Sequence, residues 1–396
     1  MKLKLRRMKM KKRAAKRIKF KTYPYTVTRV RVMKSKLLTE EDYLRMKKMG
    51  TSEIIRFLEE SEYKTEIDSL SKEYRGTELI ELALNENLAH VINKLLMISL
   101  KDEVKQLIEF YSLKWILNNV KLILRTRMNK LGEEDLKYGI IPINPTGYDK
   151  CLKMYKDDAE EFVEELSAIT GIDIERLKEL YNANDLIALE NEIDVDFYSK
   201  MIDLKKRMKL KKNDPLRQFF DHLVTLMNIK NIVRFKREGI SEEIIRKMVV
   251  IENPLRLDMK AGKGLLSIRR RRMGDKLIES MIQAEDVKAV FEKLKESRYK
   301  DLATPDVLEN PSRLEGSIDK FLLMHASRLL HRRPLSVSPI FGFLLTKEIE
   351  TKNIKLLVHA KAMGLDEKVI DNNLIVIHDS ALKALKRIEG DKARMK

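Results

Sequence analysis

The fold is decided by a pattern that first appears in Ile80-Glu81-Leu82-Ala83-Leu84-Asn85-Glu86-Asn87-Leu88 and recurs twice along the chain. In each copy a glutamate follows an apolar residue, and an aliphatic residue with Asn or Asp comes three and four positions later. The other copies are Leu189-Glu190, Ile193-Asp194 and Phe197, then Leu314-Glu315, Ile318-Asp319 and Leu322. Apolar residues at this spacing indicate amphipathic helices. Glu81, Glu190 and Glu315 therefore mark three copies of one helix.

A second marker is an asparagine inside an apolar stripe, which we assign to Asn119, Asn231 and Asn353. Apolar residues lie eight and four positions before each asparagine, and one and four positions after it, which is one face of an α-helix. The asparagines follow their glutamates by 38, 41 and 38 residues. Because both markers move together, the sequence predicts three diverged copies of one helical unit.

The boundaries of the units are expected at two loop-like stretches, 142–147 and 253–264, which are rich in Pro and Gly. We predict a basic flexible arm at 1–22, helical units at 23–140, 141–252 and 253–374, and a C-terminal extension at 375–396. In each unit the asparagine helix is followed by a break that contains Gly132, Gly239 or Gly364. The predicted fold is all-α, with three similar helical bundles in a pseudo-threefold ring or funnel.

The composition agrees with a helical protein, because the 396 residues include only 14 Gly and 9 Pro, and only 6% are aromatic. The net charge is +19, but residues 1–21 hold twelve Lys or Arg and no acid, so the remainder carries +7. A flexible arm and a translation start assigned too far upstream are both open interpretations of that run. The single Cys151 excludes an internal disulfide, and no apolar run approaches the ~20 residues of a transmembrane helix.

The repeated markers allow two interpretations. Three carboxylates that recur in the chain could converge on one axis as a catalytic or metal site. We favour a structural role, because each marker lies beside apolar positions, where a hydrogen bond fixes the register of a helix within its unit.

No other motif predicts catalysis, a cofactor or a metal. None of the six histidines is paired with another His or Cys three or four positions away. The stretch Gly262-Lys263-Gly264 lacks the rest of a phosphate loop, and the adjacent His378-Asp379-Ser380 lacks the context of a hydrolase triad. The run Arg269, Arg270, Arg271 and Arg272 is either a solvated surface or a docking patch for acidic proteins or lipid headgroups.

Two stretches resemble a known family. They are Tyr25-Thr26-Val27-Thr28-Arg29-Val30-Arg31-Val32-Met33 with Leu37-Leu38 near the start, and Pro334-Leu335-Ser336-Val337-Ser338-Pro339 with Lys347-Glu348-Ile349-Glu350-Thr351-Lys352-Asn353 near the end. They are similar to the opening and closing motifs of the C subunit of archaeal-type and V-type rotary ATP synthases. The resemblance covers about residues 23–374 and leaves out the arm and the tail.

The resemblance implies a non-catalytic funnel of three helical domains, peripheral on the cytoplasmic face of the membrane. In that family the funnel is a socket between the proteolipid ring and the D and F subunits of the central stalk, and it binds no nucleotide. We expect apolar ends of the units to contact the ring, and polar and basic surface to guide the stalk. The alternatives are a helical nucleic-acid-binding protein that uses the basic arm, an unrelated helical scaffold, and lastly an enzyme.

Overall fold

The computed structural model describes residues 22–143, 147–208, 210–211, 213–250 and 273–376. Within these ranges the protein is built of helices and has no β-strand. The α-helices are α2 (Pro24–Lys34), α3 (Glu40–Met46), α4 (Thr51–Glu59), α5 (Lys64–Leu70), α6 (Gly76–Ile98), α7 (Asp102–Met128), α8 (Glu134–Lys137), α9 (Tyr148–Lys156), α10 (Ala159–Thr170), α11 (Ile174–Asn182), α12 (Leu186–Met208), α13 (Pro215–Arg237), α14 (Glu242–Met248), α15 (Met273–Ile282), α16 (Val287–Lys295), α17 (Pro305–Glu309), α18 (Leu314–Arg332), α19 (Ser338–Ala362) and α20 (Glu367–Asn373). Short 3-10 turns lie at Lys300–Leu302 and Pro311–Arg313.

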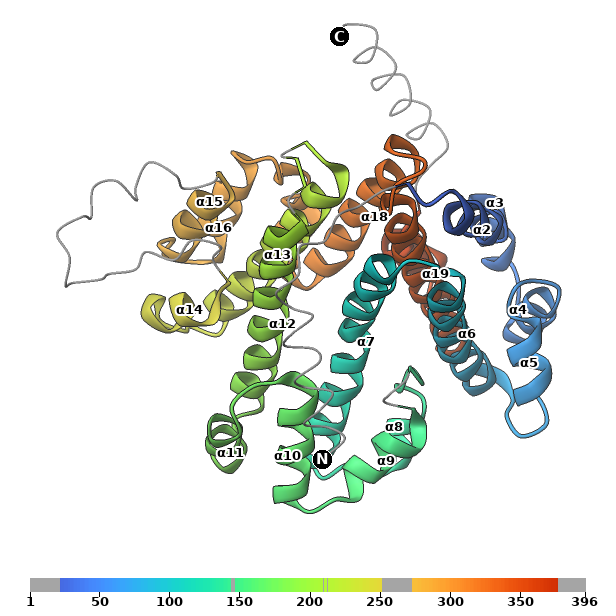
Figure 1. Ribbon diagram of the computed structural model, residues 1–396, viewed down its shortest axis with the longest axis horizontal. Helices are drawn as coiled ribbons and strands as arrows, with labels where there is room; N and C mark the ends of the chain where they lie inside the picture. The colour runs from blue at the N-terminus through green and yellow to red at the C-terminus, as the bar shows by residue number, and fades with distance from the viewer. Residues whose placement is uncertain (1–21, 144–146, 209, 212, 251–272, 377–396) are drawn as a thin grey trace, which may run out of the picture.

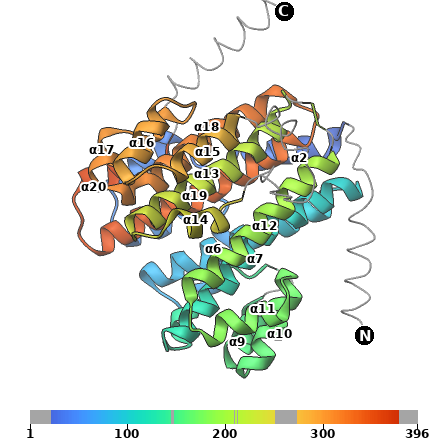
Figure 2. The same ribbon diagram turned by 90° about the vertical axis from the view of Figure 1, so that its left-hand side faces the viewer.

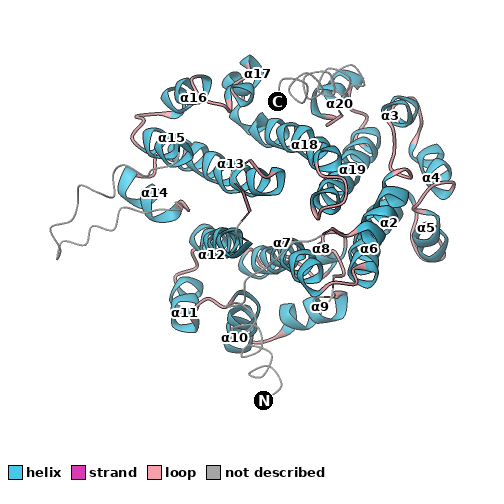
Figure 3. Cartoon of the chain, turned by 45° about the horizontal axis from the view of Figure 1, so that its top comes forward, coloured by secondary structure: helices cyan, strands magenta, loops and turns pink. Residues whose placement is uncertain are grey.

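Three pairs of long helices form the frame of the molecule: α6 with α7, α12 with α13, and α18 with α19 (Figure 1). The marker glutamates lie on the first helix of each pair and the marker asparagines on the second. Figure 3 shows the long helices in the middle, with short helices such as α4, α5, α10, α11, α14 and α16 around them. The repeat in the sequence is therefore a repeat of helix pairs.

The chain closes on itself, because its first helices pack against its last. One hydrophobic core joins α3, α4, α5 and the first half of α6 to the second half of α19 and to α20. Its buried members are Tyr43, Met46, Ile54, Leu58, Tyr63, Ile67, Leu79, Ile80, Ala83, Leu84, Ile354, Leu357, Val358, Ala360 and Ile370. In Figure 1 the blue first helices lie beside the red α19. Residues that the sequence assigns to the first and third units thus share one core.

A buried ionic network holds this closure. Lys347 and Glu350 of α19 are 1% and 3% exposed, and they pair at 2.8 Å from Nζ to Oε1. The Tyr63 hydroxyl donates to Glu350 at 2.7 Å and accepts from the Lys347 ammonium at 2.9 Å. The other Glu350 oxygen accepts the backbone N–H of Leu38 at 2.6 Å. Both buried charges have partners, which is the condition for burying an ion pair.

The three asparagine helices end in the same way, with one residue in the left-handed conformation. That residue is Gly239 after α13 and Gly364 after α19, at φ of 71° and 64°. After α7 it is Lys130, at φ of 55°, and not the nearby Gly132 that the sequence suggested. A side chain with a Cβ is strained in this region by about 1–2 kcal/mol, whereas glycine is not.

We predict that Lys130→Gly stabilises the protein, because glycine relieves this strain. The expected gain is about 1 kcal/mol after the larger backbone entropy of glycine in the unfolded chain is subtracted. The measurement is the urea midpoint, compared with that of Gly132→Ala. The added Cβ of Gly132→Ala lies at an ordinary 3.8 Å from Asp135, so little change is expected there. An equal effect of the two substitutions on the urea midpoint would contradict the assignment of Lys130 as the strained residue.

Candidate functional site

Two of the three marker asparagines make the same pair of hydrogen bonds. Asn119 donates from Nδ2 to the carbonyl of Ile141 at 2.7 Å and accepts the N–H of Ile141 at 3.0 Å. Asn353 bonds in the same way to both backbone groups of Ile375, at 2.8 and 3.0 Å. Each asparagine therefore ties a long helix to the segment 22 residues further along the chain.

In the second unit this pair of bonds belongs to Asn228, not to Asn231. Asn228 donates to the carbonyl of Val250 at 2.6 Å and accepts its N–H at 2.9 Å, again across 22 residues. Asn231 is also buried, but its amide contacts Asn191 Oδ1 at 3.4 Å and Met227 Sδ at 3.1 Å.

The sequence does carry a signal for Asn228. It lies 38 residues after Glu190, the same separation as in the other two units, whereas Asn231 lies 41 residues after it. Both candidates have apolar neighbours at the four offsets that define the stripe. The apolar pattern alone could not choose between them.

The marker glutamates form ion pairs that join helices of different predicted units. Arg125 of α7 binds Glu190 of α12 through two nitrogens, with the Nη2 contact at 2.9 Å. Lys230 of α13 pairs with Glu315 of α18. The His359 ring of α19 contacts the Glu81 carboxylate of α6, and this contact is an ion pair when the ring is protonated.

These three ion pairs follow a cyclic order. They connect the second unit to the first, the third to the second, and the first to the third. The sequence pattern predicts bonds within a unit for these glutamates, whereas the observed pairs cross between predicted units.

Polar pairs of a second set lie one helical turn further along the glutamate helices. Lys121 pairs with Asp194, and Lys355 donates to the Asn85 carbonyl oxygen at 2.8 Å. In the third copy Lys352 pairs with Asp319 at 2.8 Å. The Asn or Asp of each sequence marker is thus bonded to a lysine of a neighbouring long helix.

Charged side chains on the long helices of several units are linked by ion pairs and electrostatic proximity, and we call this set the central charged wall. It consists of Lys114, Arg125, Asp194, Lys230, Glu315, Asp319 and Lys352. The hydrogen bonds that Arg125 donates to Glu190 raise the pKa of Arg125, with further contributions from the charges of Glu190, Asp194 and Glu315. Burial acts to raise the pKa of Glu315, but Lys230, Lys352 and Arg234 lower it overall. Residues far apart in sequence are therefore electrostatic neighbours.

An aromatic cluster lies where α7, α13 and α19 approach one another. The ring of Phe341 makes edge contacts with Tyr111 at 5.4 Å and with Phe220 at 5.7 Å between centroids. Beside it, Lys114 and the buried Glu348 form an ion pair at 2.7 Å. Burial acts to raise the pKa of Glu348, but Lys114 and Lys352 lower it overall, so this buried carboxylate is charged. Aromatic packing and an ion pair thus fix the meeting point of the three helices.

Two histidines are in edge contact between α13 and α18, with ring centroids of His222 and His325 4.3 Å apart and ring planes at 65°. Burial, then the charges of His325, Arg298 and Arg328, lower the pKa of His222 to about 3. Burial, followed by Arg328 and Arg298, lowers the pKa of His325 to about 4, although the Phe321 carbonyl acts in the opposite direction. His222 Nδ1 also lies 3.0 Å from the Tyr299 hydroxyl. Both rings are therefore neutral in the fold.

We predict that this pair makes the protein less stable in mild acid. Unfolded histidines have a pKa near 6.5, so between about pH 6.5 and 4 the unfolded state binds more protons and stability falls as the pH falls. From about pH 7.5 to 5, His222 alone accounts for about 2 kcal/mol. Urea unfolding at both pH values should show a smaller loss for His222→Phe. The same loss in both proteins would show that other groups cause it.

The described residues contain no cluster of His, Cys, Asp or Glu that could hold a metal ion. Cys151 is buried, and burial raises its pKa to about 12, which makes it a poor nucleophile. The candidate docking patch Arg269 to Arg272 lies outside the described residues, as do Gly262-Lys263-Gly264 and His378-Asp379-Ser380.

No helix in the described part of the chain is both long enough and apolar enough to cross a membrane. The observed features define the class of the protein as a helical scaffold in which charged side chains join the long helices of repeated units.

Comparison with known proteins gives the family. Residues 26–373 match the family described as ATP synthase (C/AC39) subunit. A relative from Methanosarcina acetivorans, the C subunit of its A-type ATP synthase, is 30% identical over 360 residues, covering 90% of this chain and 93% of that protein. The corresponding protein of Methanococcoides burtonii is 29% identical over 354 residues, covering 89% and 94%. That of Haloferax volcanii is 28% identical over 363 residues, covering 89% and 97%.

The chain belongs to the family of C subunits of A-type ATP synthases, which is a family of non-catalytic subunits. This is the family that the two terminal motifs indicated. It makes the protein a component of a rotary ATP synthase, a membrane-associated complex.

Proposed function

We propose that the chain is the part of the central stalk that couples the membrane rotor ring to the rest of the stalk, as a funnel of three helical units around a pseudo-threefold axis. The observation that carries this proposal is the cyclic order of the marker ion pairs, Arg125 with Glu190, Lys230 with Glu315, and His359 with Glu81. Contacts that pass from each unit to the next and back to the first are what a closed ring requires.

A torque coupler must transmit force without deforming, and the centre of the molecule has suitable features. Ion pairs and aromatic contacts join helices of different units, so a load applied to one helix pair is shared by the others. The central charged wall offers polar groups to a partner, since Lys352 and Lys230 are 45% and 46% exposed at the side chain. We propose that this wall receives the D and F subunits of the stalk on the cytoplasmic side of the membrane.

Cysteine crosslinking tests this proposal with little background, because the only native cysteine is buried. Lys352→Cys and Lys230→Cys would each be introduced into the full chain and assembled with the D and F subunits. A thiol-directed crosslinker should join both variants to one of these stalk proteins. The matched control, Arg56→Cys, is exposed on the outer helix α4 and should give no such product. Crosslinks from Arg56→Cys alone, or recovery only with nucleic acid, would overturn the proposal.

A further inference from the structure

One end of the molecule is formed by α2 and by the turns that lead into α7, α13 and α19, and we call it the turn end. The start of α2 is bonded to two of these turns. The Tyr23 N–H donates to the Leu335 carbonyl at 2.7 Å, and the Thr26 hydroxyl donates to the Ile98 carbonyl at 3.1 Å. Figure 2 shows α2 and the beginning of these long helices gathered toward the right-hand side.

The turn end exposes large apolar side chains. Met97 in the last turn of α6 and Leu100 in the loop before α7 are 74% and 68% exposed. Val32 and Tyr25 on α2 are 55% and 52% exposed, and Leu335 in the turn before α19 is 46% exposed. Apolar side chains gathered at one end, with polar residues around them, are typical of a surface that meets a partner or a membrane.

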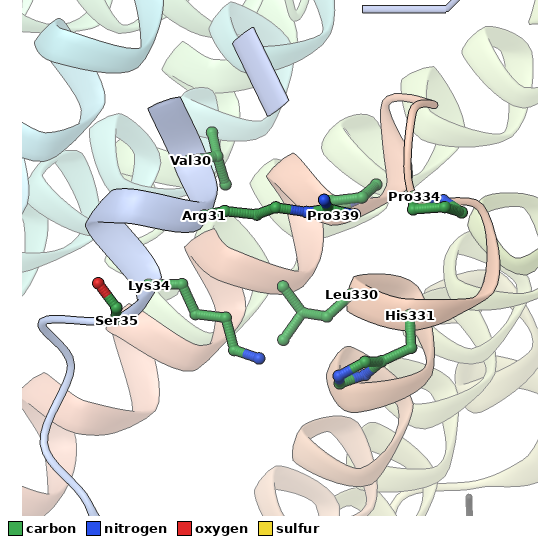
Figure 4. A pocket seen from close by; sticks show the side chains of 8 residues that line it. All are labelled: Val30, Arg31, Lys34, Ser35, Leu330, His331, Pro334 and Pro339. Atoms are coloured by element: carbon green, nitrogen blue, oxygen red, sulfur yellow. The ribbon is translucent and has the colours of Figure 1, made fainter. Parts of the chain in front are cut away.

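A cavity of about 420 Å³ lies in this end, between the second half of α2, the end of α18 and the start of α19 (Figure 4). Its apolar residues are Val30, Leu330, Pro334 and Pro339, and its polar residues are Arg31, Lys34, Ser35 and His331. Arg31, Ser35, His331 and Pro334 are exposed, so the cavity opens to the surface. In Figure 4 the Lys34 ammonium and the His331 ring extend toward the same side of Leu330.

The charge of the cavity is of one sign, since no Asp or Glu is among its lining residues. The acids at the turn end do not line the cavity: Asp214 pairs with Arg333, Glu103 accepts from the Tyr23 hydroxyl at 3.2 Å, and Asp102 is exposed at the start of α7. An apolar cavity with cationic groups at its mouth suits an anion that carries a hydrocarbon part.

We propose that this cavity binds the phosphate-bearing headgroup of an anionic phospholipid, while the exposed apolar side chains enter the interfacial layer of the bilayer. Arg31 and Lys34 contact the phosphate, Leu330 and Pro334 supply apolar contact within the cavity, and Met97 and Leu100 enter the bilayer elsewhere on the same end. The apolar residues favour a lipid over free phosphate, because a small soluble anion gains nothing from them. The site is separate from the central charged wall and does not depend on the stalk-binding role.

The test measures co-sedimentation of the full chain with phosphatidylcholine vesicles, with and without about 30 mol% phosphatidylglycerol. Binding should require the anionic lipid. The double variant Arg31→Ala, Lys34→Ala should bind about tenfold to thirtyfold more weakly. Met97→Ser, Leu100→Ser should also weaken binding, without changing the net charge. The matched control is Arg56→Ala, Lys64→Ala, which removes the same charge from exposed positions on α4 and α5.

Three outcomes would overturn the proposal: equal losses in the cavity and control variants, equal binding to neutral vesicles, or displacement of the protein by inorganic phosphate at constant ionic strength. The melting temperature of each variant shows whether its fold is intact. Crosslinking of the cavity variant to the D and F subunits should be unchanged. Failure of lipid binding can thus be distinguished from failure of the stalk role.

Discussion

Glu350→Ala is expected to lower the free energy of unfolding by about 3–5 kcal/mol, because it leaves the ammonium of Lys347 buried with only the Tyr63 hydroxyl as a partner. The same change removes the acceptors of the Tyr63 hydroxyl and the Leu38 N–H. Thermal unfolding monitored by circular dichroism should show a melting temperature about 4–6 °C lower, given the size of the chain. The loss should appear first where α19 packs on the first helices.

Lys347→Met is the informative comparison for this network. It leaves a charged Glu350 that still accepts two hydrogen bonds, from Tyr63 and Leu38, so we expect a smaller loss of about 2–3 kcal/mol. Lys352→Ala is the control on the same helix, since its side chain is 45% exposed and should cost less than about 1 kcal/mol. If Glu350→Ala were no worse than Lys352→Ala, the network would contribute nothing to the closure of the chain.

The helical class and the repeat were predictable because both depend on local periodicity. Amphipathic spacing around Glu81 and around Asn119 is a property of single helices, and α6 and α7 contain them as expected. The break after each asparagine helix was also visible in sequence. The left-handed residue of this break in the first unit could not be predicted, because it is Lys130 and lysine is not a residue type that favours positive φ.

The partners of the marker glutamates could not be predicted, because pairing between helices depends on tertiary arrangement. The residues that pair with Glu190 and Glu81 are separated from them by 65 and 278 positions in the chain, respectively. The partners are of three different residue types, Arg125, Lys230 and His359. The sequence therefore contains no repeated residue that would identify them as equivalent. A repeat indicates which residues are equivalent, but it does not indicate which copies touch.

The closing motif shows the same division between sequence and structure. Lys347, Glu348 and Glu350 are charged residues on a helix that the sequence identified, and their burial was not foreseen. Helix α19 is covered by α18 on one side and by α2, α4 and α6 on others, so its charged side chains find partners inside the protein. That burial follows from the closure of the chain, which joins segments about 300 residues apart.

Asn228→Ala should destabilise the protein by about 3–5 kcal/mol, because the carbonyl and the N–H of the buried Val250 each lose their hydrogen bond to the amide, and an orphaned buried group costs about 1–3 kcal/mol. Asn231→Ala removes a 3.4 Å contact and a sulfur contact and should cost about 1 kcal/mol. Urea unfolding of both variants measures the difference directly.

The equivalent substitutions set the scale for that comparison. Asn119→Ala and Asn353→Ala break the same two bonds to Ile141 and Ile375, so they should match Asn228→Ala. Agreement of these three, with Asn231→Ala well below them, would show that the repeat is carried by an asparagine 38 residues after each glutamate. A larger loss of stability for Asn231→Ala than for Asn228→Ala would show that Asn231, 41 residues after Glu190, is the equivalent asparagine. Asn228 and Asn231 are both buried on the same helix, α13. The difference in unfolding free energy between their alanine variants therefore measures the hydrogen bonds and not general packing.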